Sequence, residues 1–178
     1  MALPQESAKL IMLSGYFVFL AAILYFFSLG QLSWILLAAS AIGWFAIESR
    51  SAGKRLGNAL KLGAFLLVFD FIFENAGWLL GLWEAKSAVA VGVVPLEVMA
   101  IAFFGGAAWA LYLPKRFSLA HSLADALVFA FFGALGEWLL IRQGLFSYDL
   151  WWTSAHAFVS YLIAWGALHF MRYKVFRE

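Results

Sequence analysis

The sequence has no cysteine among its 178 residues, and only 12% of its residues carry a charged side chain. The absence of cysteine excludes disulfides, thiolate nucleophiles, zinc–thiolate sites and iron–sulfur clusters. Soluble domains usually contain about 25% charged residues, so this low charge content points away from a soluble protein. Lys and Arg outnumber Asp and Glu only by 12 to 10, which argues against a DNA or RNA partner.

Apolar residues make up 65% of the chain, and they fall into long uninterrupted stretches. The hydrocarbon core of a bilayer is about 30 Å thick, so a helix needs about 20 apolar residues to cross it. We therefore expect an all-α integral membrane bundle of six transmembrane helices, forming a single domain over residues 1–178 in the cell membrane. The predicted spans are residues 10–29, 32–49, 61–83, 95–114, 123–145 and 153–172.

The basic residues give an independent test of these spans, because short loops rich in Lys and Arg remain in the cytoplasm. Ten of the 12 basic residues fall at one set of alternate helix ends, and Lys86 and Arg142 alone fall at the other. This division predicts cytoplasmic N- and C-termini. The ten are Lys9, Arg50, Lys54, Arg55, Lys61, Lys115, Arg116, Arg172, Lys174 and Arg177.

Apart from Glu48 and Asp125, which are close to the cytoplasmic ends of their spans, four acidic residues lie inside the predicted spans or at the outer start of one. Asp70 and Glu74 lie in the third span and Glu137 in the fifth, while Glu97 follows Pro95 at the start of the fourth. A charged side chain at mid-bilayer costs at least about 2.5 kcal/mol on insertion scales, so acids retained there are functional candidates. Glu97 has a structural alternative, as a cap of the helix that Pro95 begins.

Asp70, Glu74, Gly77 and Gly81 are spaced by four, three and four residues, which places them along one helix face. The glycines allow a second backbone or a ligand to come close, and acids shut away from water hold a proton that they can donate. Glu74 and Glu137 are predicted at similar depth. The alternative is structural, with the acids bonded to neighbouring helices or Glu137 paired with Arg142.

The other polar residues of the spans predict no further site. Glu48 and Asp125 are expected near the cytoplasmic boundary, where water reaches them. His156 and His169 lie 13 residues apart, about 20 Å along a helix axis, so we expect no shared metal site. Motifs for dinucleotides, ATP and acyl-serine chemistry are absent from the sequence, so no cofactor is predicted.

A short pattern occurs twice along the chain. Residues 74–83 and 137–146 both contain Glu, six residues, then Gly-Leu and an aromatic residue. The offset maps the third span onto the fifth and the fourth onto the sixth, so the sequence predicts a repeat of helix pairs. Such parallel repeats often form a site at their interface, near the middle of the membrane.

The segment from Phe73-Glu74 through Gly77, Gly81 and Trp83, followed by Pro95-Leu96-Glu97 and Phe103-Phe104, resembles the membrane-embedded carotenoid enzymes. The lycopene cyclase domain family has an acid and Gly-x-Trp before Pro-x-Glu-Glu and a Phe-Phe pair. The carotenoid hydratase family has Phe-Glu, spaced glycines and Gly-Val-Pro. This chain has Val98 in place of the second acid of Pro-x-Glu-Glu, which departs from the cyclase pattern.

The resemblance implies an enzyme that protonates a double bond of a long isoprenoid to give a carbocation. The carbocation would then close a ring or be captured by water. Glu74 and Glu137 would share the acid and base work, Glu97 would assist, and Asp70 would tune or relay. Aromatic faces stabilise such a cation. The candidate substrate-binding residues are Gly77, Trp78, Gly81, Trp83, Phe104, Trp109, Trp138 and Trp165.

Two other classes of function remain open at this point. The chain is equally compatible with a non-catalytic subunit whose acids meet neighbouring chains of a larger membrane complex. It is also compatible with a proton-coupled carrier, for which intramembrane acids and a repeat are expected. A carrier of six helices would need to form a homo-oligomer to enclose a pathway.

Overall fold

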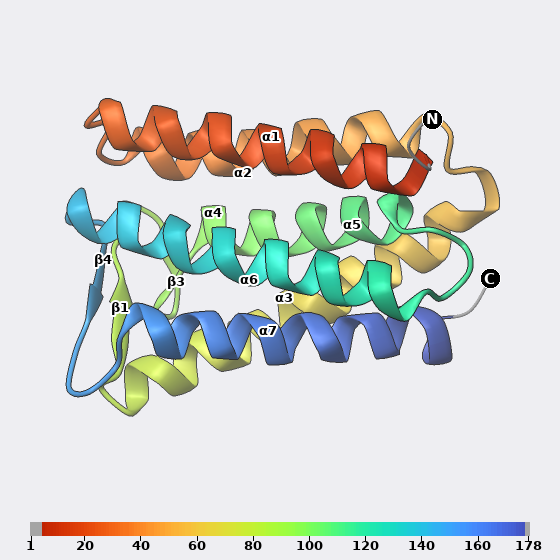
Figure 1. The fold of residues 1–178 in the computed structure, drawn as a ribbon. Coiled ribbons are helices and arrows are strands. Elements are labelled where there is room, and N and C mark those ends of the chain that lie inside the picture. Colours follow the sequence, from red (N-terminus) through yellow and green to blue (C-terminus); the bar gives the residue numbers. More distant parts are fainter. Residues whose placement is uncertain (1–4, 177–178) are drawn as a thin grey trace.

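The computed structural model describes residues 5–176, and over these residues the chain is a bundle of helices with two very small sheets (Figure 1). The prediction of an all-helical protein is confirmed. Four helical segments are long and apolar enough to cross a membrane: Ser7–Phe26, Leu32–Ser49, Gly53–Leu79 and Leu119–Arg142. The apolar helix Leu96–Tyr112 is shorter.

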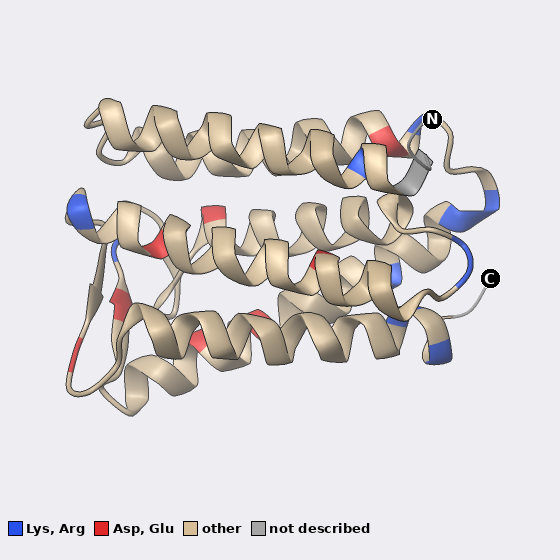
Figure 2. Ribbon diagram, viewed as in Figure 1, with Lys and Arg blue, Asp and Glu red and all other residues tan. Residues whose placement is uncertain are grey.

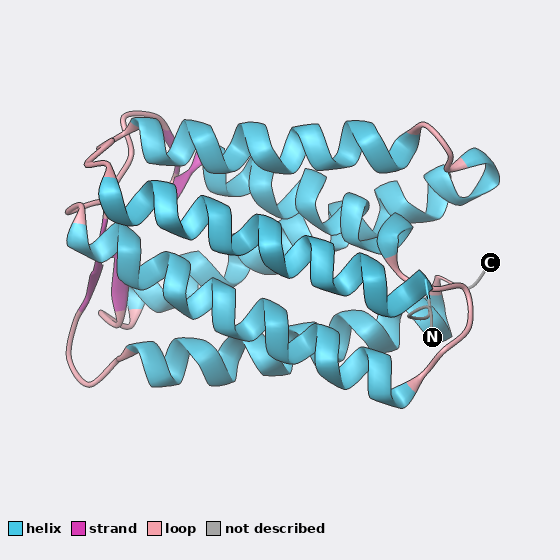
Figure 3. Cartoon of the chain, turned by 45° about the horizontal axis from the view of Figure 1, so that its top comes forward, coloured by secondary structure: helices cyan, strands magenta, loops and turns pink. Residues whose placement is uncertain are grey.

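The helices lie side by side with their long axes roughly aligned (Figures 1 and 3). The helix α3 (Leu56–Leu79) is preceded by a 3₁₀ turn, Gly53–Arg55, and the π-helical segment Ile101–Gly105 joins α4 (Leu96–Ala100) to α5 (Gly106–Tyr112). A second π-helical segment, Met171–Val175, extends α7. The α-helices are α1 (Gln5–Phe26), α2 (Leu32–Ser49), α3 (Leu56–Leu79), α4 (Leu96–Ala100), α5 (Gly106–Tyr112), α6 (Leu119–Arg142) and α7 (Ser154–Phe170).

The helices α3 and α6 end before the predicted spans 61–83 and 123–145 do, so those two boundaries were wrong. Gly81 and Gly144 have φ of +65° and +72°, a conformation that glycine adopts without steric cost. In each case the next N–H, that of Leu82 or Leu145, bonds to a carbonyl five residues back and closes the helix. The sequence remains apolar after both glycines, so its hydropathy alone did not show where the helices end.

The two segments that follow these glycines pair with each other. Strand β1 (Trp83–Ala85) is antiparallel to β4 (Phe146–Tyr148), with Trp83 opposite Tyr148. The flanking bonds are reciprocal, since Lys86 N–H donates to Leu145 O and Asp149 N–H donates to Leu82 O, both at 2.8 Å. The repeated Gly-Leu-aromatic pattern therefore builds the same turn and strand twice. The strands β2 (Ala90–Val91) and β3 (Val94–Pro95) form a separate hairpin.

The start of α1 and the end of the segment Met171–Val175 lie at the end of the bundle opposite β1 and β4 (Figure 1). Most Lys and Arg residues are at the same end, whereas Asp and Glu also occupy positions along the middle of the helices (Figure 2). Arg177 lies outside the described residues. The separation of basic residues between the two ends agrees with the division seen in the sequence.

The α3 and α5 helices meet through small residues. A Cβ built on Gly63 would lie 2.4 Å from the backbone oxygen of Phe103 and 3.1 Å from the Ala107 Cβ. Small residues at such positions let two membrane helices approach closely. The contact fixes the position of α3, which carries Asp70 and Glu74.

We expect Gly63→Ala to lower the free energy of unfolding by about 1 to 3 kcal/mol, because a carbonyl of the neighbouring helix must move away from the added methyl group. Detergent-solubilised protein unfolded by heat or SDS measures the change. Gly57→Ala, in the same helix, is the matched control because a Cβ at Gly57 meets nothing within 4 Å. Equal stability of the two variants would contradict this packing.

Candidate active site

Glu74 lies near the end of α3 and is bonded by a tryptophan that follows the helix. The Trp83 Nε1–H donates to Glu74 Oε2 at 3.0 Å, and the Trp83 side chain is buried. The indole reaches the carboxyl group by folding over Gly77, where a Cβ would lie only 2.0 Å from the ring. The close approach expected at Gly77 is thus made by the indole of the same chain.

Glu137 lies on α6 and accepts hydrogen bonds from two phenols. The Tyr148 hydroxyl donates to Glu137 Oε2 at 2.5 Å, and the Tyr161 hydroxyl of α7 also bonds to this carboxyl group. The Tyr161 ring packs directly on Gly133, one turn before Glu137, where a Cβ would lie 2.9 Å from the ring. Both glutamates are therefore held by an aromatic donor that packs on a glycine of the same helix.

The small sheet connects the two glutamates. Trp83 and Tyr148 are opposite each other in the β1–β4 ladder, and each donates to the glutamate of the helix before its own strand. Burial raises the pKa of Tyr148 above its usual value, and the nearby Glu137 carboxyl group raises it further. The phenol therefore remains protonated and donates to Glu137 over the physiological pH range.

Asp70 completes a cluster of three carboxyl groups, and we call Asp70, Glu74 and Glu137 the acid cluster. All three are close enough to interact electrostatically with one another. One oxygen of Asp70, Oδ2, is buried and has no hydrogen-bond partner among the described residues. Neighbouring carboxyl groups in a medium of low dielectric make it more costly to ionise one another.

The fourth predicted acid, Glu97, has a different environment. Its Oε2 accepts a hydrogen bond from the Ser87 hydroxyl at 2.9 Å, and its side chain does not cap the N-terminus of α4. Ser87 belongs to the segment between β1 and β2. Glu97 thus secures this connection, and no interaction with the acid cluster is seen among the described residues.

Arg142 does not neutralise Glu137. Its guanidinium lies over the rings of Tyr25 and Trp138, at 4.5 and 5.1 Å from their centroids. Within residues 5–176 no ion pair joins Arg142 to Glu137. The proposed pairing of these two residues is therefore wrong, and the partners of Glu137 are phenols.

The predicted substrate-binding residues fall into three groups. Gly77, Gly81 and Trp83 form the turn that holds Glu74. Trp78 and Trp138 follow Glu74 and Glu137 by four residues and one residue, and are 48% and 40% exposed. The remaining three lie elsewhere in the aromatic packing: Phe104 against Phe45, Trp165 against Phe129 and Trp109 against Trp165.

A second buried polar cluster was missed by the sequence analysis. Asp125 is completely buried, although it was expected where water reaches it. Its Oδ2 accepts from Trp109 Nε1 at 2.8 Å and lies 3.0 Å from His169 Nε2. Three helices, α5, α6 and α7, therefore meet at this carboxyl group.

The spacing of residues on α6 and α7 could have revealed this cluster. Asp125, Phe129, Gly133 and Glu137 recur every four residues along α6, and Tyr161, Trp165 and His169 do so along α7. The two faces pack antiparallel, with Asp125 beside His169, Phe129 stacked on Trp165 and Tyr161 on Gly133. Such four-residue spacing marks one helix face.

Two cavities, of about 460 and 290 Å³, are found near the end of the bundle that holds the termini. The larger is lined by residues of the α5–α6 loop and the end of α7, and the smaller by Lys9, Arg55, Tyr112 and their neighbours. Among the described residues, no three His, Asp or Glu side chains are grouped so that they could hold a metal ion.

A scan against protein-family models found no matching family. Searches of curated proteins and of solved structures found no match either.

Proposed function

We propose that the chain is a six-span membrane enzyme of the cell membrane, with cytoplasmic termini, that protonates a double bond of a long isoprenoid or carotenoid. The observation that carries this proposal is the acid cluster itself. It joins three carboxyl groups from two helices with one indole and two phenol donors, within one chain. The reaction would be of the cyclase or hydratase type and would need no redox cofactor.

The environment of each acid suggests its role. A proton on the unpartnered Oδ2 of Asp70 has no competing acceptor among the described residues, which favours its delivery to an apolar guest, directly or through Glu74. The carboxyl group of Glu137 is deeply buried, and the two phenol hydrogen bonds that it accepts offset part of the cost of ionising it there. After protonation of the alkene gives a carbocation, Glu137 would remove a proton from the cation or from the water that captures it.

The surface around the acid cluster supports access from the bilayer. Trp78, one turn after Glu74 on α3, is 48% exposed, and Leu79 beside it is 78% exposed. A polyene dissolved in the hydrocarbon core would meet these side chains first. Ring faces of this kind stabilise a carbocation or other cation by about 2 kcal/mol or more when water is excluded.

Expression in a lycopene-producing host tests the proposal. We expect the wild-type chain to convert lycopene to a new pigment, and Glu74→Gln and Glu137→Gln to reduce its formation by roughly a hundredfold, the usual contribution of a general acid or base. Glu84→Gln is the matched control, because Glu84 is exposed on β1. Pigments are quantified by chromatography at equal amounts of membrane-inserted protein.

Two results would contradict the proposal. The wild type could give no new pigment, which would favour a non-catalytic subunit of a larger complex. Alternatively, both glutamine variants could retain the wild-type product profile, which would remove Glu74 and Glu137 from the chemistry.

A further inference from the structure

The two buried polar clusters of this protein share one face of α6. Asp125 and Glu137 are twelve residues apart on that face, which is about 18 Å along the helix axis. The helix begins at the end of the bundle where most Lys and Arg residues lie, which we call the basic end (Figures 1 and 2). Asp125, in the second turn of α6, is therefore the nearer of the two acids to the basic end.

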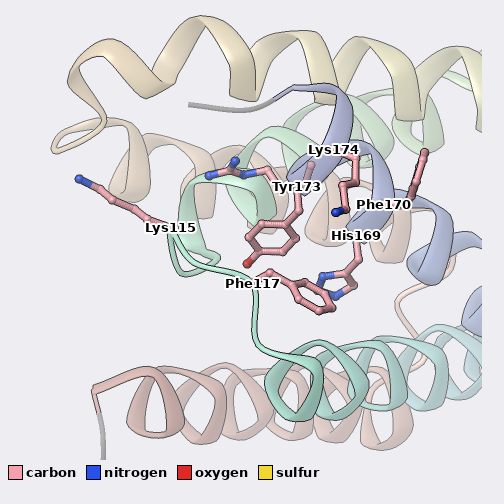
Figure 4. Close-up of a pocket in the computed structure, with 7 residues that line it drawn as sticks. Lys115, Phe117, His169, Phe170, Tyr173 and Lys174 are labelled. Carbon is pink, nitrogen blue, oxygen red and sulfur yellow. The ribbon is translucent and has the colours of Figure 1, made fainter.

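His169 lies between Asp125 and the larger cavity at the basic end. Its Nε2 is 3.0 Å from Asp125 Oδ2, and its side chain is among those that line the cavity of about 460 Å³ (Figure 4). Its other ring nitrogen, Nδ1, is buried and has no hydrogen-bond partner among the described residues. One side of the imidazole thus contacts the buried acid, and the other can make a further hydrogen bond.

Several other titratable groups surround this pair. Tyr112, at the end of α5, is close enough to Asp125 to interact electrostatically, and its ring lies near that of His121. The carboxyl group of Asp125 supplies the negative charge that attracts a proton to a region that also contains basic side chains. The titratable and charged residues that line the cavity with His169 are Lys115, Arg172, Tyr173 and Lys174.

Buried polar atoms without partners continue from this pair toward the acid cluster. Within residues 5–176, Asp125 Oδ1 and Trp165 Nε1 both lack a hydrogen-bond partner, and Asp70 Oδ2 lacks one at the far end. Nearly all buried polar groups of folded proteins are hydrogen-bonded, and the exceptions mark catalytic groups or sites of internal water and ions. Three such atoms in one direction indicate a route that water enters.

The spacing of polar side chains on α7 fits such a route. His169, Trp165 and Tyr161 are four residues apart, so successive members are about 6 Å apart along the axis. Two hydrogen bonds of about 2.8 Å each span nearly that distance, so one water molecule can bridge each interval. The Tyr161 hydroxyl then reaches the acid cluster, because it bonds to Glu137 and also interacts electrostatically with Asp70 and Glu74.

We propose that His169 and Asp125 carry protons between the larger cavity and the acid cluster, through water molecules held along α7 by Trp165 and Tyr161. Asp and His side chains within membrane spans are typical of proton relays. The inference rests on the proposed function and deepens it, because it connects the acids that protonate the double bond with water at the basic end.

The transfer can be written with every proton accounted for. With His169 protonated on Nε2, a proton from water binds Nδ1 as the Nε2 proton passes to the Asp125 carboxylate. Asp125 then gives this proton to water held by the Trp165 N–H, and the imidazole regains its first tautomer by exchange with water. Tyr161 accepts the proton on its oxygen as its own passes to Glu137. Trp165 only orients the water, because an indole N–H is a donor and not an acceptor.

The test measures how fast the protons of the acid cluster exchange with deuterium. The full chain is reconstituted in phosphatidylcholine vesicles and transferred to D₂O, and infrared spectroscopy follows the carbonyl bands of protonated carboxyl groups. The bands of interest are those that Asp70→Asn, Glu74→Gln or Glu137→Gln removes. We expect His169→Gln to slow their exchange by roughly a hundredfold, as for the loss of other positioned proton-transfer groups. Glutamine retains an N–H donor for Asp125 but does not titrate.

Trp165→Phe is the second variant, because it removes the indole N–H and keeps a ring against Phe129. It should also slow the exchange. Trp44→Phe is its matched control, since Trp44 stacks on Phe129 as well but is not among the described residues with an unpartnered buried nitrogen. His156→Gln, an exposed position of α7, is the control for His169→Gln. Both controls should exchange like the wild type.

The direction of the change separates a proton route from a packing defect. A loosened bundle would admit water and speed the exchange, whereas loss of the route slows it. Wild-type exchange in His169→Gln and Trp165→Phe, or equal slowing in their controls, would overturn the proposal. A wild type without an exchangeable carboxyl band would overturn it too, since the route would have no proton to deliver. No isoprenoid is present in the vesicles, so this failure is distinct from a failure to form pigment.

Discussion

Replacing Asp125 with alanine should lower the free energy of unfolding by about 2 to 6 kcal/mol, because two buried groups lose their common acceptor and each unsatisfied buried donor costs about 1 to 3 kcal/mol. The carboxyl group is completely buried, and it receives Trp109 from α5 and contacts His169 of α7. Without it, the indole N–H and the imidazole are left in an apolar environment with no acceptor, and three helices lose their common contact. Thermal or SDS unfolding in detergent measures the loss.

Two further variants show whether the hydrogen bonds are responsible. Asp125→Asn keeps an oxygen that can accept from Trp109, so its stability should lie between those of the wild type and Asp125→Ala. Asp149→Ala removes an exposed acid from the loop after β4 and should change stability by no more than about 0.5 kcal/mol. Wild-type stability of Asp125→Ala would show that the cluster does not hold the helices together.

The second large effect is expected at Gly77. The added methyl group of Gly77→Ala would lie 2.0 Å from the Trp83 ring, so the indole must leave its place and release Glu74. Because Trp83 is paired with Tyr148, the displacement should also disturb the bond from Tyr148 to Glu137. We expect a loss of about 1 to 3 kcal/mol in stability, together with faster amide hydrogen exchange in β1 and β4.

The control for this change lies on α6. A Cβ at Gly136 meets nothing within 4 Å, so Gly136→Ala should stabilise the helix or leave it unchanged. If Gly77→Ala shows wild-type exchange in both strands, the indole does not pack on Gly77 as described. If the proposed chemistry is correct, Gly77→Ala should also form less pigment than Gly136→Ala in the lycopene-producing host.

The acid cluster was foreseen in part from the sequence. Glu74 and Glu137 were selected because acids are costly within apolar spans, and their equivalent positions in the repeated pattern suggested a similar depth. Their partners were not foreseen. Trp83 was expected to bind substrate, but its indole folds back over Gly77, since the glycine at 81 reverses the chain direction after α3.

The sequence by itself determined the helical nature of this protein, the approximate positions of its apolar segments and the separation of its basic residues. These features depend only on composition and on the order of residues along the chain, because the length of an apolar segment decides whether it can cross a membrane and the basic residues decide which side its ends face. The tertiary structure alone decided that Asp125 is buried, that Glu137 is bonded to Tyr161 and that His169 lies against Asp125. Such contacts join residues far apart in the sequence, and their geometry depends on the rotation of each helix about its axis, which a uniformly apolar sequence leaves undefined.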